Sequence, residues 1–208
     1  MKLKALQVGP IGTNCYFLLD ENTNKAAIID PGDEAEVILY QFPLDGVEVE
    51  YILLTHGHYD HTTAVPDLKE ALPNAKVYIH EADAPMLTEA DKNGFSFFFR
   101  QDRVWKAADV LLRDGDTVKV GSAAFTIVHT PGHSPGSVCY LCEAEGIMLT
   151  GDTLFADNIG RCDLWGGSYA TIRQSLKRLR DYDGTLTILP GHGDSNTLSK
   201  ALDNTMYI

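Results

Sequence analysis

The sequence contains little cysteine. Only 4 cysteines occur among 208 residues, scattered along the chain as Cys15, Cys139, Cys142 and Cys162. Disulfide scaffolds of secreted proteins are much denser in cysteine, so that class is excluded and free thiols are expected. Cys139 and Cys142 form a C-x-x-C inside the apolar stretch SVCYLC. A strand points residues three apart to opposite faces, which favours strand packing over the alternative, a redox or zinc role.

Long hydrophobic runs are also missing. The N-terminal segment MKLKALQVGPIGTN contains two lysines but no apolar run of signal-peptide length, and no later stretch approaches the length of a membrane span. The hydrophobic content of 44% matches an ordinary globular domain. We therefore expect a cytoplasmic protein that does not associate with membranes.

Cationic side chains are few. The chain has 17 lysines and arginines against 29 acidic residues, which gives a formal net charge of −12. This balance repels the phosphate backbone of nucleic acids and anionic membrane surfaces over most of the exterior. We therefore expect a small-molecule partner and no nucleic acid.

Linkers and low-complexity segments are absent as well, so one domain spanning residues 1–208 is expected. Apolar periodicity and turn residues indicate strands and helices in two similar halves, each with strands followed by a helix. Strands are predicted at 3–8, 15–20, 25–30, 49–55, 76–80, 117–120, 124–130, 137–142, 146–152 and 185–190. Helices are predicted at 34–42, 64–72, 169–182 and 198–204, with another beginning near Glu81. Two β-sheets faced by helices are the simplest arrangement of these elements, and the first three strands are expected to be antiparallel.

An aromatic stretch, FSFFF, covers Phe95 to Phe99. It falls between helix and strand signals, where a connecting loop is expected. Its rings could fill part of the core. They could instead form a wall of a substrate cleft or a dimer contact, and the sequence leaves the roles of Phe95, Phe97, Phe98 and Phe99 and the oligomeric state open.

Histidines and aspartates gather at strand ends. Five of the 7 histidines lie in glycine-containing turns within the segments THGHYDH, TPGHSPG and LPGHG, and an aspartate lies in LTGDT. We expect Gly57 to let the backbone curl so that His56 and His58 turn inward together. Imidazole and carboxylate groups are ligands for zinc-like ions, and a shared carboxylate can hold two ions roughly 3.5–4 Å apart. The candidate ligands are His56, His58, Asp60, His61, His133, Asp152 and His192.

The H-x-H-x-D-H signature in these segments resembles the metallo-β-lactamase superfamily, and the resemblance covers nearly the whole chain. It implies an α/β fold, a four-layer αβ/βα sandwich of two mixed β-sheets flanked by helices. It also implies two divalent metal ions, with zinc as the expected metal and iron or manganese as alternatives. By this resemblance His56, His58 and His133 hold the first ion, Asp60, His61 and His192 hold the second, and Asp152 bridges them.

Within the superfamily, the segments NCYFL, DPGD, TPGHSPGS and TGDTLFADNIGRCDLWGGS are most similar to small glyoxalase II enzymes, the hydroxyacylglutathione hydrolase-like thioesterases. The resemblance implies cleavage of a thioester by a metal-bridging hydroxide, with Asp60 as the catalytic carboxylate that orients it. β-Lactamases are expected to match less well, because they usually carry another residue at the position of His61 and use a cysteine ligand. Larger glyoxalase II enzymes contact glutathione through an additional C-terminal helical region, whereas this sequence ends soon after GHGDSNTL. A smaller thioester or another ester is therefore an alternative substrate.

Other residues are expected to support the site. Asp30 could orient a metal-bound histidine or cap the following helix or turn. Arg161 could contact substrate, and its pairing with Asp163 could hold their loop over the site. His80 and His129 are expected to be packed or solvated histidines away from the ligands.

Other functions compatible with the ligand set are a mono-iron persulfide dioxygenase, which would use His56, His133 and Asp152, and a lactonase. A non-catalytic metal-binding module is disfavoured, because closed structural zinc sites are usually rich in cysteine.

Overall fold

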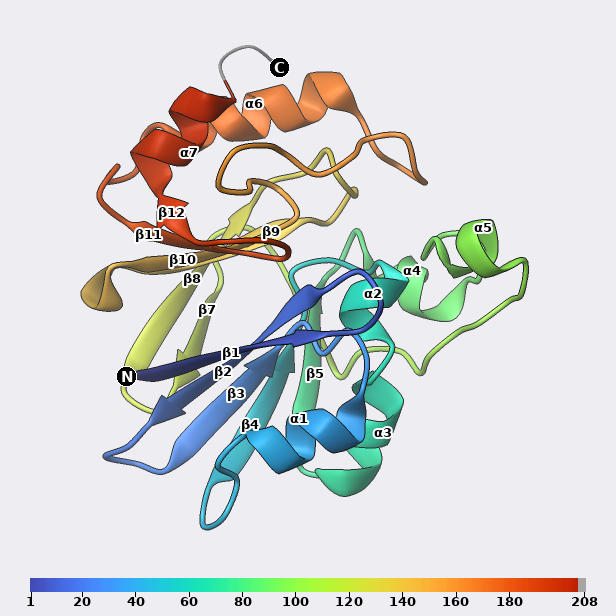
Figure 1. The fold of residues 1–208 in the computed structure, drawn as a ribbon, viewed down its shortest axis with the longest axis vertical. Coiled ribbons are helices and arrows are strands. Elements are labelled where there is room, and N and C mark those ends of the chain that lie inside the picture. Colours follow the sequence, from blue (N-terminus) through green and yellow to red (C-terminus); the bar gives the residue numbers. More distant parts are fainter. Residues whose placement is uncertain (206–208) are drawn as a thin grey trace.

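Two six-stranded β-sheets form the centre of the protein, and helices cover their outer faces (Figure 1). The computed structural model describes residues 1–205. Three clusters of buried apolar side chains separate four layers: one beneath α1 (Ala35–Gln41) and α3 (Val65–Ala71), one between the sheets, and one beneath α6 (Tyr169–Leu179) and α7 (Leu198–Asn204). The predicted four-layer αβ/βα sandwich is confirmed.

The first sheet has the order β1-β2-β3-β4-β5-β6. The predicted antiparallel pairing holds from β1 to β3, and the remaining neighbours are parallel, so the sheet is mixed. Its strands are β1 Lys2–Val8, β2 Thr13–Asp20, β3 Lys25–Ile29, β4 Glu48–Leu53, β5 Lys76–His80 and β6 Val110–Leu112.

The second sheet has the order β12-β11-β10-β9-β8-β7, and only its β10–β11 pair is parallel. Its strands are β7 Thr117–Val120, β8 Ala123–His129, β9 Val138–Cys142, β10 Ile147–Gly151, β11 Thr187–Pro190 and β12 Asn196–Thr197. The two sheets are tied where the start of β2 meets the end of β11, because the Asn14 backbone N–H donates to the Gly191 carbonyl at 2.7 Å.

The two cysteines of the C-x-x-C segment point to opposite faces of a strand, as predicted. Cys139 packs in the cluster beneath α6 and α7, whereas Cys142 packs between the sheets. Both thiols are free, and burial raises the pKa of Cys139 to about 11. The pair therefore contributes to packing on two faces of β9.

Several short elements differ from the sequence prediction. The stretch predicted as a loop is a helix, α5 (Phe95–Phe99), and the residues that flank it, Gly94 and Arg100, both have positive φ. The helix expected near Glu81 begins later, as α4 (Ala84–Thr88). The helix α2 (Tyr59–Thr62) and the strands β6 and β12 were not predicted, because segments of two to four residues carry no readable periodicity. None of the helices within residues 1–205 combines the length and apolarity that crossing a membrane requires.

Candidate metal centre

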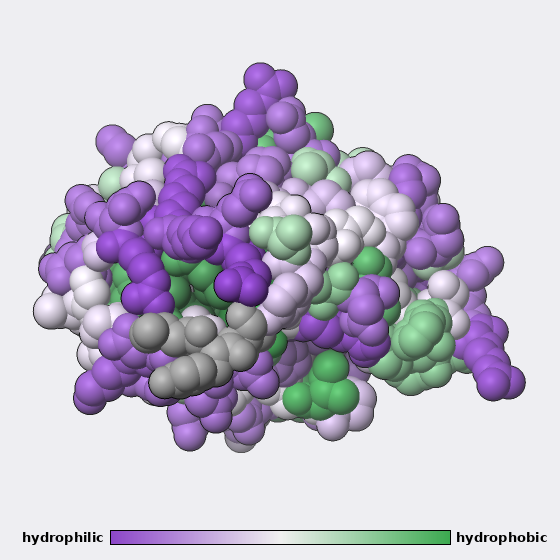
Figure 2. All heavy atoms as spheres, turned by 90° about the horizontal axis from the view of Figure 1, so that it is seen from above, coloured by the Kyte–Doolittle hydropathy of each residue, from purple (hydrophilic) through white to green (hydrophobic). Residues whose placement is uncertain are grey.

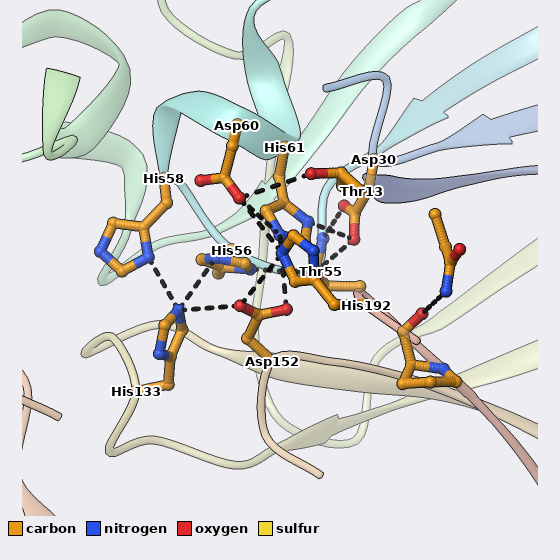
Figure 3. A network of polar contacts seen from close by, with 12 residues as sticks. Thr13, Asp30, Thr55, His56, His58, Asp60, His61, His133, Asp152 and His192 are labelled. Atoms are coloured by element: carbon orange, nitrogen blue, oxygen red, sulfur yellow. Dashed lines mark hydrogen bonds and ion pairs between the residues drawn. The ribbon is translucent and has the colours of Figure 1, made fainter. Parts of the chain in front are cut away.

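The seven candidate ligands come together at one edge of the sandwich. Figure 3 shows them pointing into a common volume from segments that follow β4, β8, β10 and β11. Three sets of three side chains each offer ligand atoms within 4.8 Å of one another. The sets are His56, His58 and His133; His56, His61 and Asp152; and Asp60, His61 and His192. Four segments that are far apart in the sequence therefore meet at one place.

The first group consists of three buried imidazoles. Nε2 of His133 lies 2.8 Å from Nδ1 of His58 and 3.2 Å from Nε2 of His56. Burial lowers the pKa of all three rings, and their mutual repulsion adds to this for His56 and for His58, whose pKa falls to about 3. Neutral imidazoles keep a nitrogen lone pair for a cation.

The second group joins a carboxylate to two imidazoles. Nε2 of His192 lies 3.2 Å from Oδ2 of Asp60 and 3.3 Å from Nε2 of His61. The Thr13 hydroxyl donates to the same Asp60 oxygen at 3.5 Å. Asp60 and His192 are partly exposed, whereas all three histidines of the first group are buried, so this group faces solvent more than the first.

Asp152 lies between the two groups. Its Oδ2 is 3.6 Å from Nε2 of both His133 and His192, and its Oδ1 is 3.4 Å from Nε2 of His61. Burial opposes ionisation, but the neighbouring histidines outweigh it and hold the pKa of Asp152 below its usual value. Oδ1 is buried and accepts no hydrogen bond within the described chain. A buried carboxylate oxygen that lies among imidazoles and accepts no hydrogen bond fits a cation.

Asp30 lies against the metal centre and not at a helix start. Its Oδ2 is 3.0 Å from Nδ1 of His61, and its carboxylate also accepts from the backbone N–H and hydroxyl of Thr55 at 2.8 and 2.6 Å. Helix α1 begins at Ala35, with Glu34 at its cap position. Of its two expected roles, the geometry therefore favours orienting a histidine.

Asp83 is a buried residue of the site that the sequence does not predict. This buried carboxylate accepts from the Gly57 and Gly136 N–H groups and from the Ser134 hydroxyl, so it links the loop of His56 and His58 to the loop of His133. Burial raises its pKa to about 6, although the three donors oppose the rise. An acid in the segment HEADAP carries no recognisable motif, so no sequence signal could have identified it.

Gly57 serves a purpose other than the predicted one. It is absent from the glycines with positive φ, but a Cβ at this position would lie 2.5 Å from Cβ of Met86. The close approach of α4 to the ligand loop, and not a special backbone conformation, therefore requires glycine here.

A cavity of about 400 Å³ opens directly over the centre. Phe98 and Arg161 both line it, whereas Phe95 packs against the core. Of the two roles considered for the aromatic stretch, the core role therefore applies to Phe95 and the cleft role to Phe98. The predicted pair is present, with Arg161 donating to Asp163 at 2.7 and 2.9 Å. The Arg161 carbonyl also lies 2.7 Å from Nδ1 of His133, so this loop orients a ligand through its backbone.

His80 and His129 lie apart from the seven ligands, as expected. Their rings stack at 4.0 Å where the ends of β5 and β8 meet. Nε2 of His129 lies 2.9 Å from the Pro135 carbonyl, in the loop that carries His133. The pair therefore joins the two sheets close to the site without entering it.

A protein-family model matches most of the chain. The family model described as "Metallo-beta-lactamase superfamily" matches residues 8–192, and the chain belongs to this superfamily of metallo-hydrolases. The histidine and aspartate cluster is consistent with the dinuclear metal site of the superfamily.

Two curated relatives match almost end to end. The "Probable metallo-hydrolase YqgX" of Bacillus subtilis is 32% identical, with 100% of this chain and 98% of the relative covered. The "Hydroxyacylglutathione hydrolase GloC" of Haemophilus influenzae is 29% identical, with 96% and 94% covered.

Two solved structures are similar over their full length. The B3 metallo-β-lactamase BLEG-1 superposes with a TM-score of 0.92 at 33% identity, with 99% of both chains covered. TTHA1623 in a di-iron-bound form superposes with a TM-score of 0.86 at 33% identity, with 99% of this chain and 100% of that chain covered. The expectation that β-lactamases match less well is wrong for BLEG-1. Similarity of sequence and fold therefore does not by itself distinguish a thioesterase from a β-lactamase.

Proposed function

We propose that this protein is a metal-dependent hydrolase that cleaves thioesters of the hydroxyacylglutathione type. The observation that carries the proposal is the position of Asp152 between two groups of ligands, each open toward one cavity. The hydroxyacylglutathione hydrolase among the relatives supports the substrate class. The proposed partner is a small thioester or ester in the cytoplasm, and not a nucleic acid.

The donor set fits two divalent ions. His56, His58 and His133 would hold one, Asp60, His61 and His192 the other, and Asp152 would contact both. Such a pair would make water a nucleophile near neutral pH and stabilise negative charge on the carbonyl oxygen. Zinc is the proposed metal because of the nitrogen-rich donors, and the di-iron-bound relative keeps iron as an alternative.

The chain's own groups would prepare this chemistry. Asp30 and the Arg161 carbonyl accept the Nδ1 protons of His61 and His133, which leaves the Nε2 lone pair of each ring facing the centre. Asp60 lines the cavity and would orient the attacking water through its carboxylate. A thiolate leaving group departs without strong protonation, which is consistent with the histidines of the centre being committed as ligands.

Metal analysis combined with hydrolysis of S-lactoylglutathione tests the proposal. We expect two divalent ions per chain, loss of activity with chelator, and a fall in kcat/KM of at least about 100-fold for Asp152→Asn. The matched control is Asp157→Asn, an exposed aspartate in the same loop, which should retain activity.

Three results would overturn parts of the proposal. One iron per chain with oxygen consumption on glutathione persulfide would indicate the dioxygenase. Faster cleavage of the β-lactam nitrocefin than of any thioester would indicate the activity named for BLEG-1. Unchanged activity of Asp152→Asn would remove the central ligand assignment.

A further inference from the structure

An apolar recess covers the candidate metal centre. Its cavity of about 400 Å³ carries five large apolar or aromatic side chains, contributed by the β1–β2 turn, α2, α5 and the loop between β10 and α6. They are Ile11, Tyr59, Phe98, Phe155 and Leu164. A concave apolar wall beside a polar reactive centre is typical of a site for a small organic ligand.

The wall formed by α5 is anchored and still open to solvent. The Tyr59 ring lies 5.7 Å from the Phe95 ring and 5.6 Å from the Phe98 ring, which fixes α5 against α2. Phe98 nevertheless remains 46% exposed, and Ile11 on another segment of the rim is 55% exposed. Figure 2 shows a largely hydrophilic face with several hydrophobic patches, one of which lies on the right, the side on which Figure 1 places α5. Apolar surface left uncovered at a cavity mouth favours binding of an apolar group.

Cationic groups are scarce at the same place. Among the described residues that line this cavity, Arg161 is the single lysine or arginine, and both of its contacts with Asp163 use its guanidinium. The guanidinium carbon lies 5.6 Å from the Phe98 ring. Arg103 lines a separate neighbouring cavity. The two carboxylates of a glutathione moiety would therefore meet one cation, which already has a partner.

We infer that the substrate carries an uncharged alkyl or aryl group beside its scissile carbonyl, and that this group packs against Phe98, Phe155 and Ile11. The inference rests on the proposed hydrolase function and, among the thioesters proposed there, favours those with an apolar acyl group and a thiol portion without the two carboxylates of glutathione. Phe98 is a specificity-determining residue in this arrangement, because it presents its ring to the cavity from an element separate from all seven ligands.

A binding series tests the inference without catalysis. The probes are the uncharged thioethers S-methyl-, S-butyl- and S-hexyl-N-acetylcysteamine, titrated calorimetrically into the protein as purified. Each methylene should tighten binding about two- to fourfold where it is buried. This dependence on chain length should be lost in Phe98→Ala, be largely retained in Phe98→Leu, and persist in the control Phe97→Ala, whose residue is 67% exposed and does not line the cavity.

The outcomes separate the two proposals. Equal affinities along the series, or the same dependence on chain length in Phe98→Ala as in the unaltered protein, overturn the apolar subsite. So does binding of S-methylglutathione that is tighter than that of the S-hexyl thioether. Binding that depends on chain length, with no hydrolysis of the matching acyl thioesters, supports the subsite and contradicts the thioesterase.

Discussion

Replacing Asp83 with alanine should destabilise the protein and loosen its metal centre together. Asp83 is fully buried and joins the two loops that carry the first group of histidines. In Asp83→Ala the Gly57 and Gly136 N–H groups lose their acceptor, while the Ser134 hydroxyl can still bond to Ser137 at 2.6 Å. Two backbone donors are therefore left buried and unpaired.

The size of the effect follows from these contacts. Each unpaired buried donor costs about 1–3 kcal/mol. Burial of the charged carboxylate, which raises its pKa to about 6, offsets part of what Asp83 contributes at neutral pH. We therefore expect a loss of about 3 kcal/mol in the free energy of unfolding, equivalent to about 6–12 °C in Tm for a chain of this size.

Thermal unfolding of chelator-treated protein measures the stability effect apart from metal binding. Asp91→Ala is the control, because Asp91 is an exposed acid close by in the sequence. A competition titration with a chromophoric zinc chelator should also show about 10- to 100-fold weaker binding in Asp83→Ala. A Tm and a zinc affinity equal to those of Asp91→Ala would refute the view that Asp83 holds the two loops together.

Three further predictions concern other buried groups. Asp30→Asn should weaken zinc binding about 10- to 100-fold in the same titration, because the amide no longer accepts equally well from His61, and unchanged affinity would contradict this role. Burial and the neighbouring His129 lower the pKa of His80 to about 4, so the folded protein does not take up the proton that the unfolded chain binds below about 6.5. Stability should therefore fall as the pH is lowered from about 6.5 toward 4, and His80→Gln should make the fall in Tm of chelator-treated protein shallower. Alkylation with iodoacetamide followed by mass spectrometry should modify Cys162 first, since the other three cysteines are buried, and equal labelling of all four in the folded protein would contradict the packing.

Much of the fold could be predicted because its elements have strong local patterns. The alternation of β2 places Tyr16 and Leu18 between the sheets and Phe17 beneath α1, so that one strand is apolar on both faces. Helix α6 repeats Ile172, Leu176 and Leu179 on its buried side, and Ser168 caps its start through Thr171. Such signals depend on neighbours in the sequence and are readable without the fold.

The short elements around the site were less readable. Helix α5 has only five residues, which is too short for a helical period to show in the sequence, and four of the five are phenylalanines. The sequence predicts that Gly57 lets the backbone curl. In the structure, glycine is required there because α4 packs too close to the ligand loop for a side chain. Contacts between distant segments leave no trace in local periodicity.

The sequence by itself determined the layer architecture and the identity of the ligand candidates, because strand periodicity and the histidine-rich turns are properties of contiguous residues. Only the tertiary structure decided how the candidates divide into groups around Asp152, and that Asp83 links two of their loops. It also decided that Phe98 faces the cavity and Phe95 the core. These features depend on how loops from two separate sheets meet at one edge, and that meeting is set by the packing of the sheets against each other.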